Sequence, residues 1–442
     1  MGGDFSRNTF DPSKHYSRVL MQQGRVQLDA DFNEQHAILL HRLRLLARDL
    51  VGRHAGPADL PDSFEIAAIN VSGAYVPRDF SIAPGRYYVD GILCENDAAA
   101  QYTGQPSFPV DDKDDPVALR DSHNYLVYLD VWERDVTYME DPSIRDGALG
   151  GPDTSTRARV TWQVRVSELT SEQARNHAAS GEALLDEFLL SAGLDSITDP
   201  MLSVRASPGT QYRGSENHLY RIEVHRPGTA ADSAADYEGT ATFKWSRDNG
   251  SVLFPIEEIS GSELRLSNLA GNLSARLQVG DWVEVVDDTY ELRGRAFPLL
   301  QVTGIKEGDR LVTPSESVPS DVGGDPALHP YIRRWDQRAG VGEDGTLPVV
   351  ATEPDSWIEV EDGVQIKFSA PGSYRTGDFW MIPARIATGD VEWPGDPSHP
   401  RWVTPHGITH YYAPLAKLNI DAAGGPEVVQ DYRRKAIQLW SS

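Results

Sequence analysis

The chain has 442 residues, 40% of them hydrophobic, and its formal net charge at pH 7 is -25. This excess of carboxylates argues against nucleic acids and anionic membranes as partners, because both carry negative charge. Cys94 is the single cysteine, which rules out an intrachain disulfide and a zinc site built from several cysteines. The 38 glycines and 29 prolines favour short strands joined by turns, and the length predicts several modules.

The first residues show no targeting signal. The segment MGGDFSRNTFDPSKHYSRVL lacks the apolar core of a signal peptide, and no run of about 18 apolar residues occurs in the sequence. We therefore expect synthesis in the cytoplasm, no cleaved signal peptide and no direct insertion into a membrane.

An irregular arm, residues 2–28, precedes the strongest helical pattern in the chain, residues 29–52. Asp31 and Glu34 resemble a capping box at the start of this helix, and Gly52 is placed to terminate it. Apolar residues recur at helical spacing: Phe32, Leu39, Leu43, Leu46 and Leu50. Two interpretations stay open, because the helix can pack on its own domain or bundle with copies of itself.

From residue 64 onward the sequence changes to the pattern of strands. Segments rich in β-branched and aromatic residues are separated by Gly, Pro, Asp and Asn. The pairs Asp90-Gly91 and Asn249-Gly250 each predict a hairpin turn. Residues 171–194 predict one or two helices packed on a sheet, and residues 257–315 predict a small barrel or sandwich of four or five strands.

These patterns predict a mainly β protein of several small β-sandwich or barrel modules, with an N-terminal arm and α-helix as a minor α+β part. We expect the arm and helix in residues 1–60, a β module with a helical insertion in 61–227, a small barrel-like module in 228–315, and a C-terminal β module and tail in 316–442. The last ten residues are expected to form a short helix or a tail that docks on a neighbour.

Signatures of common catalytic sites are absent from the sequence. There is no phosphate loop, no H-E-x-x-H, no G-x-S-x-G and no dinucleotide fingerprint. His406 and His410 stand four apart, but Pro405 and Gly407 argue against a helix, and strand spacing would separate the two histidines by about 13 Å. They are expected to be structural, with a metal on the axis of a trimer as the alternative.

Acidic residues gather in two places. Asp130, Glu133 and Asp135 share one strand segment, but the first two point to opposite faces, which weakens a paired-carboxylate role. The second cluster lacks the spacing of an EF-hand loop: Asp281, Glu284, Asp287 and Asp288. We interpret both clusters as solvated surface. The 10 Trp and 17 Tyr residues would suit contact with glycans, although core packing is their expected use.

Several blocks resemble an uncharacterised bacterial family almost from end to end. They include HYSRVLMQQGRVQLDADFNEQ (15–35), ALGGPDTSTRARVTWQVRV (148–166), ATFKWSRDNGSVLFPI (241–256), and RTGDFWMIPARIATGDVEWP with HGITHYYAPLAKL (375–418). The opening block also resembles the start of phage tail-fibre and baseplate proteins. This resemblance implies a structural part of a tail, baseplate or contractile injection apparatus, and such proteins are homo-oligomers, often trimers.

We therefore expect a non-enzymatic baseplate, fibre-adaptor or decoration subunit that acts by assembly and uses no cofactor. Its partners would be other subunits of a tail-like particle and further copies of itself, with a trimer favoured. The expected interface residues are Phe5, Phe10, Tyr16, Val19, Leu20, Phe32, Leu39, Leu43, Leu46 and Leu50. A glycan-binding attachment module and a cell-envelope glycan hydrolase are the alternatives, and a cleft with two carboxylates about 5–10 Å apart would mark the hydrolase.

Overall fold

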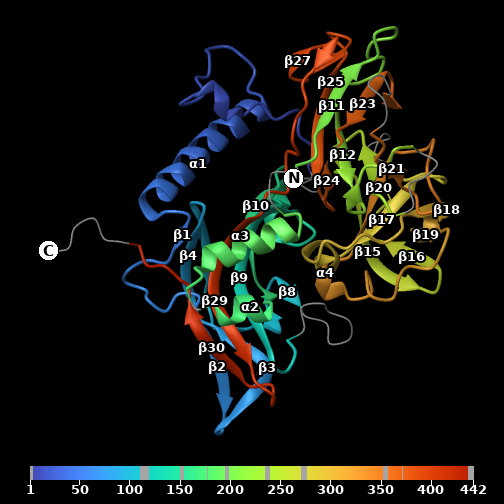
Figure 1. The fold of residues 1–442 in the computed structure, drawn as a ribbon. Coiled ribbons are helices and arrows are strands. Elements are labelled where there is room, and N and C mark those ends of the chain that lie inside the picture. Colours follow the sequence, from blue (N-terminus) through green and yellow to red (C-terminus); the bar gives the residue numbers. More distant parts are fainter. Residues whose placement is uncertain are drawn as a thin grey trace.

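The computed structural model describes residues 3–109, 119–149, 154–176, 178–194, 199–233, 239–269, 276–351, 357–370 and 372–436. Within these ranges the protein is mainly β, as the sequence predicts, and its strands form several small antiparallel sheets and one barrel. Figure 1 shows the long helix α1 (Asp29–Val51) on one side of the molecule and the barrel on the opposite side. The predicted C-terminal helix or tail lies largely outside the described residues.

A four-stranded sheet forms the centre of the first half. Its order is β10-β9-β29-β30, with bounds Arg157–Glu168, His123–Val136, Tyr411–Ile420 and Pro426–Asp431. The long strand β9 is buried along most of its length because both of its faces are covered. Val127 and Leu129 point into the core shared with the N-terminal sheets, whereas Leu126 and Tyr128 point toward helix α3.

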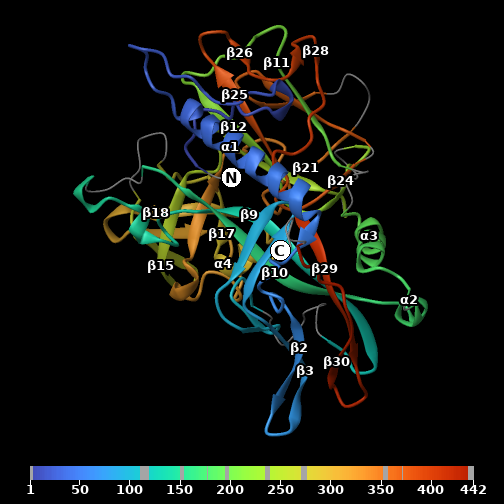
Figure 2. The same cartoon turned by 90° about the vertical axis from the view of Figure 1, so that its left-hand side faces the viewer.

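The N-terminal strands form three small sheets beside β9. The order β1-β4-β5 has bounds His54–Ala55, Gly85–Val89 and Ile92–Asn96; β2-β3-β6 has Ile66–Val71, Ala74–Ile82 and Ala100–Gln101; and β7-β8 has Gly104–Gln105 and Phe108–Pro109. Asp90-Gly91 joins β4 to β5 with positive φ at both residues, which confirms the predicted hairpin. The hairpin of β2 and β3 projects from the body in both views (Figures 1 and 2).

Helices α2 (Ser171–Arg175) and α3 (Gly181–Ser191) confirm the predicted helical insertion. Thr170 and Gln173 form a capping box on α2, and the Ser180 side chain caps α3. Leu184 and Leu185 of α3 are buried against the face of β9 and β29 that lies opposite the N-terminal core.

A five-stranded sheet dominates the second half. Its order is β21-β14-β12-β25-β26, with bounds Leu347–Pro348, Thr242–Ser246, His218–Val224, Phe379–Arg385 and Asp390–Val391. A second sheet, β11-β23-β22, shares its core and has bounds Leu202–Ala206, Val364–Phe368 and Ile358–Glu361. Two further pairs complete this part: β13-β24 (Gly228–Thr229, Ser373–Tyr374) and β27-β28 (Gly395–Asp396, His399–Pro400).

The predicted small barrel is a closed barrel of six strands. Around the barrel they run β15-β16-β19-β18-β17-β20, with bounds Leu253–Ser260, Glu263–Leu266, Leu311–Pro314, Leu300–Lys306, Trp282–Val286 and Tyr331–Trp335. The sixth strand, β20, comes from beyond residue 315 and closes the barrel by pairing with both β15 and β17. Helix α4 (Asp288–Leu292) follows β17 directly.

One local prediction, the hairpin at Asn249-Gly250, is wrong in its details. Asn249 and Gly250 both have positive φ, as in a hairpin turn, but β14 and β15 on either side belong to different sheets. This turn therefore carries the chain from the five-stranded sheet into the barrel. Two strand pairings join segments that lie far apart in the sequence, β9 with β29 and β12 with β25.

Short 3-10 turns occupy several of the connections. Their bounds are Pro12–Lys14, Pro142–Ile144, Gly147–Leu149, Glu307–Asp309 and Pro326–Leu328. Of the helices that the structure describes, none has the length and apolarity needed to span a membrane.

Candidate functional site

Helix α1 lies on the outside of the protein and touches the body along one side (Figure 2). Ala30 and Ile38 are its buried residues. Two ion pairs fix its C-terminal half: Arg44 lies 2.7 Å from Glu133, and Arg48 lies 3.2 Å from Asp90. These contacts leave the opposite side of the helix exposed to solvent.

The acidic residues at the start of α1 hold the arm and do not cap the helix. Leu28 is the N-cap residue and makes no side-chain capping bond, so the predicted capping box of Asp31 and Glu34 is wrong. The Ser6 backbone N–H donates to Asp29 at 2.9 Å, and the Thr9 hydroxyl donates to Glu34 at 2.6 Å. The helix begins at Asp29, so Asp31 lies inside the first turn and not at the N-cap position.

The exposed side of α1 is apolar. Five side chains are between 49% and 68% exposed, and we call them the α1 apolar surface: Phe32, Leu39, Leu43, Leu46 and Leu50. From Leu39 onward they follow the alternating four- and three-residue spacing of a coiled-coil seam. Leu40 and Leu45 are also exposed and widen this surface. A helix on a solvent-facing side normally carries polar residues there.

The arm residues predicted for the same interface divide into two groups. Tyr16 and Leu20 are exposed, at 57% and 70%, and Val19 is half-buried beside Gln35, to which its N–H donates. Phe5 packs on the five-stranded sheet of its own chain, and Phe10 contacts His41 of α1 with tilted rings whose centroids are 5.6 Å apart. These two aromatic residues therefore anchor the arm within the chain.

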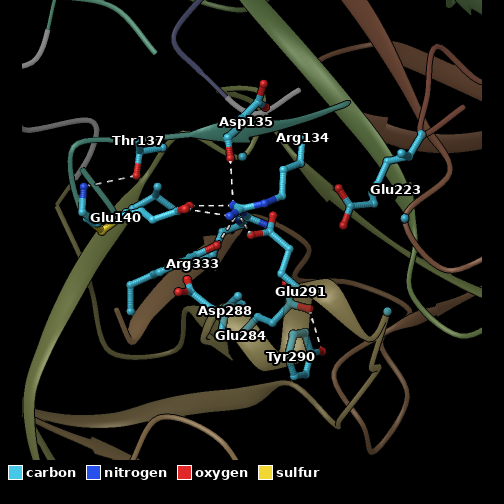
Figure 3. A pocket seen from close by; sticks show the side chains of 18 of the residues that line it. Arg134, Asp135, Thr137, Glu140, Glu223, Glu284, Asp288, Tyr290, Glu291 and Arg333 are labelled. Carbon is cyan, nitrogen blue, oxygen red and sulfur yellow. Dashed lines mark hydrogen bonds and ion pairs between the residues drawn. The ribbon is translucent and has the colours of Figure 1, made fainter. Parts of the chain in front are cut away.

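A charged cavity of about 140 Å³ forms the second candidate site. It lies where the end of β9, the five-stranded sheet, the barrel and α4 meet, and ten of its lining residues are labelled in Figure 3. Cavities of this size hold ligands of about six to ten heavy atoms. The sequence analysis did not predict it.

Buried ion pairs line one part of the cavity. Lys244 Nζ lies 2.6 Å from Glu284 and 3.2 Å from Glu223, and Arg221 pairs with Glu223 at 2.5 Å. Glu284 also accepts hydrogen bonds from the Tyr290 hydroxyl and the Trp335 indole, both at 2.9 Å. Burial acts to raise the pKa of Glu284, but neighbouring cations, Lys244 above all, outweigh it and the pKa is lowered. Glu284 is therefore ionised at neutral pH.

A second set of charges faces the open part of the cavity. Arg134 makes a bidentate pair with Glu140, with both contacts at 2.6 Å, and its distance to Glu291 is 3.9 Å (Figure 3). Arg333 donates to the Tyr331 hydroxyl at 3.0 Å, while its buried Nε has no hydrogen-bond partner. Among the described residues, no carboxylate lies within 4.0 Å of Arg333. Among the charged side chains described above, Arg333 and Glu291 thus have the weakest ion pairing.

The acidic residues singled out in the sequence are dispersed over several contacts. Glu284 and Asp288 line the cavity, and Asp288 bonds His329 at 2.9 Å. Asp281 pairs with Arg338 at 2.7 Å, and Asp287 caps α4 through the Tyr290 N–H. Within the described parts of the chain, no group of three or more His, Cys, Asp or Glu residues has the arrangement of a metal site.

Asp130 of the first acidic cluster and the two histidines, His406 and His410, make hydrogen bonds or ion pairs with other residues of the chain. Asp130 is buried and bonds His410 at 2.6 Å, with Arg165 at 3.2 Å. His406 is exposed, and its Nδ1 accepts a hydrogen bond from the Met381 N–H at 2.9 Å. Each histidine therefore has a structural role in this chain, and a metal shared between chains stays a prediction.

The fold and these two sites define a multi-sheet β protein with a protruding helix and an interior charged cavity. A model described as a family of unknown function, DUF6519, matches residues 1–187 and 183–427, and the chain belongs to that family. No curated protein and no solved structure matches the chain.

Proposed function

We propose that this protein is a structural subunit of a phage-tail-like contractile injection system, and that it assembles by packing α1 against α1 of other copies of the chain. The observation that carries the proposal is the α1 apolar surface on a helix whose other side is fixed to the body. The tail-like setting rests on the resemblance of the opening block, QQGRVQLDADFNEQ, which continues into the same helix.

The energetics favour a bundle over an isolated helix. Burying a Leu or Phe side chain contributes about 1.5–3 kcal/mol, so five contribute on the order of 10 kcal/mol per chain. A pair of helices buries ten such side chains, and their combined contribution exceeds the association cost of about 4–15 kcal/mol, so self-association is favourable. A trimer stays the favoured stoichiometry, because the opening block resembles tail-fibre and baseplate proteins, which are often trimers.

Light scattering of the purified protein at low micromolar concentration tests the proposal. We expect a closed oligomer for the wild type and a monomer for the double variant Leu43→Glu/Leu46→Glu. Leu190→Glu is the matched control, because Leu190 is also an exposed helical leucine, at 60%, but lies on α3. Point variants are preferable to removal of residues 1–52, because Phe5 of the arm packs on the five-stranded sheet.

Two results would contradict the proposal. A monomeric wild type would show that α1 does not hold copies of the chain together. An oligomer that persists in Leu43→Glu/Leu46→Glu and dissociates in Leu190→Glu would place the interface elsewhere.

A further inference from the structure

The charged residues that line the cavity suit a ligand site, besides connecting the barrel to the five-stranded sheet. Most of its charges are satisfied at short range, as in the pairs of Lys244 with Glu284 and of Arg134 with Glu140. Arg333 and Glu291 are the exceptions and carry opposite charges. The buried Nε atoms of Arg333 and Arg134 both have no hydrogen-bond partner, although buried polar atoms normally find one, and Arg333 has no ion pair among the described residues in addition.

The two groups reach the cavity from different elements. Arg333 stands on β20 of the barrel, and Glu291 stands on α4 with 37% of its side chain exposed. Figure 3 shows Glu291 and Arg134 pointing toward one another, with Arg333 on the same side of the cavity. Arg134 lies 3.9 Å from Glu291, and no ion pair of Arg333 occurs among the described residues, so both Glu291 and Arg333 have capacity for a further contact.

The lining also indicates which chemistry the ligand has. Sugar sites present exposed aromatic faces, whereas Tyr290 and Tyr331 here are buried and bonded to charged side chains. A guanidinium suits a carboxylate, and a carboxylate suits an ammonium group. Exclusion of water raises the pKa of Glu291, against the lowering effect of Arg333 and Arg134, and a bound ammonium group would favour the ionised form of Glu291.

We propose that this cavity binds a small zwitterion of the α-amino-acid class, with its carboxylate on Arg333 and its ammonium group on Glu291. The volume of about 140 Å³ matches an amino acid of small or medium size. The site is independent of α1, so binding and assembly are separable properties of the chain.

Thermal-shift measurements with each common amino acid at about 10 mM identify the ligand, which calorimetry on the full chain then characterises. We expect at least one amino acid to bind. Its analogues without the amino group or without the carboxyl group should bind about tenfold or more weakly, the effect of losing one charge-assisted contact. Arg333→Gln and Glu291→Gln should each weaken binding to a similar extent.

Glu258→Gln is the matched control, because Glu258 lies on the barrel strand β15 with 61% exposure and does not line the cavity. It should leave binding unchanged. Glu291→Gln keeps the test decisive if Arg333→Gln fails to fold, because Glu291 is partly exposed. The proposal is overturned if no amino acid binds, if the analogue lacking the amino group binds equally well, or if Glu291→Gln binds like the wild type.

Discussion

The buried carboxylate of Glu284 joins the barrel to the five-stranded sheet, and its removal is expected to destabilise the protein strongly. Glu284 stands on β17, and its partner Lys244 stands on β14 at 2.6 Å. Its two oxygens accept from three donors, those of Lys244, Tyr290 and Trp335. In Glu284→Gln, one of these positions becomes an NH₂ group that faces another donor.

The magnitude follows from the burial of both charges. The side chains of Glu284 and Lys244 are each 4% exposed, so the loss of one partner leaves an uncompensated charge away from water. Breaking such a pair costs about 3–5 kcal/mol. Glu223 lies 3.2 Å from Lys244 and compensates part of this loss, which places the expected value at the lower end of that range.

Urea unfolding followed by tryptophan fluorescence measures the effect. The chain also offers a control, an exposed ion pair with the same nitrogen-to-oxygen distance. Lys306 and Glu263 also pair at 2.6 Å in the barrel, but they are exposed to water. Glu263→Gln should leave the unfolding midpoint unchanged, because exposed pairs contribute little. If Glu284→Gln shifts the midpoint no further than Glu263→Gln, the reasoning from burial is refuted.

Three further perturbations have defined outcomes. Gly91→Ala should lower the hydrogen-exchange protection of α1, because a Cβ at this position would meet the Arg44 carbonyl. Gly73→Ala is the control: Gly73 also has positive φ, but a Cβ there meets open space, so the protection of α1 should not change. Burial lowers the pKa of His225 to about 4 from 6.5, so this residue contributes stability above pH 6.5 that is lost as pH falls toward 4, and His225→Gln should flatten that acid loss in urea titrations. Burial raises the pKa of Asp378 from 3.8 to about 7, so its contribution is lost as pH rises through 7. Asp378→Asn should therefore be more stable than the wild type at pH 8 by about 1–3 kcal/mol, and equal stability would contradict the assignment.

The sequence alone determined the features that depend on near neighbours in the chain. The alternation of apolar and turn residues is sufficient to predict a mainly β protein, and the apolar repeat predicts the helix at Asp29–Val51. Asp90-Gly91 forms the expected hairpin because both residues tolerate positive φ and the flanking segments pair with each other.

Tertiary structure decided which of the predicted patterns meet. Asn249-Gly250 has the backbone of a hairpin turn, but strong pairing of β14 with β12 and of β15 with β16 sends the two flanking strands into different sheets. Helix α1 begins two residues before the predicted cap Asp31, and the arm, far from α1 in the sequence, binds the carboxylates of Asp29 and Glu34.

The charged cavity depends entirely on such long-range contacts. Arg134, Glu291 and Arg333 come from β9, α4 and β20, and no spacing in the sequence links them. Local sequence patterns indicate the preferred backbone conformation and which face of an element is apolar. A charged cavity of this kind forms only when separate sheets pack together and exclude water from the charged side chains between them.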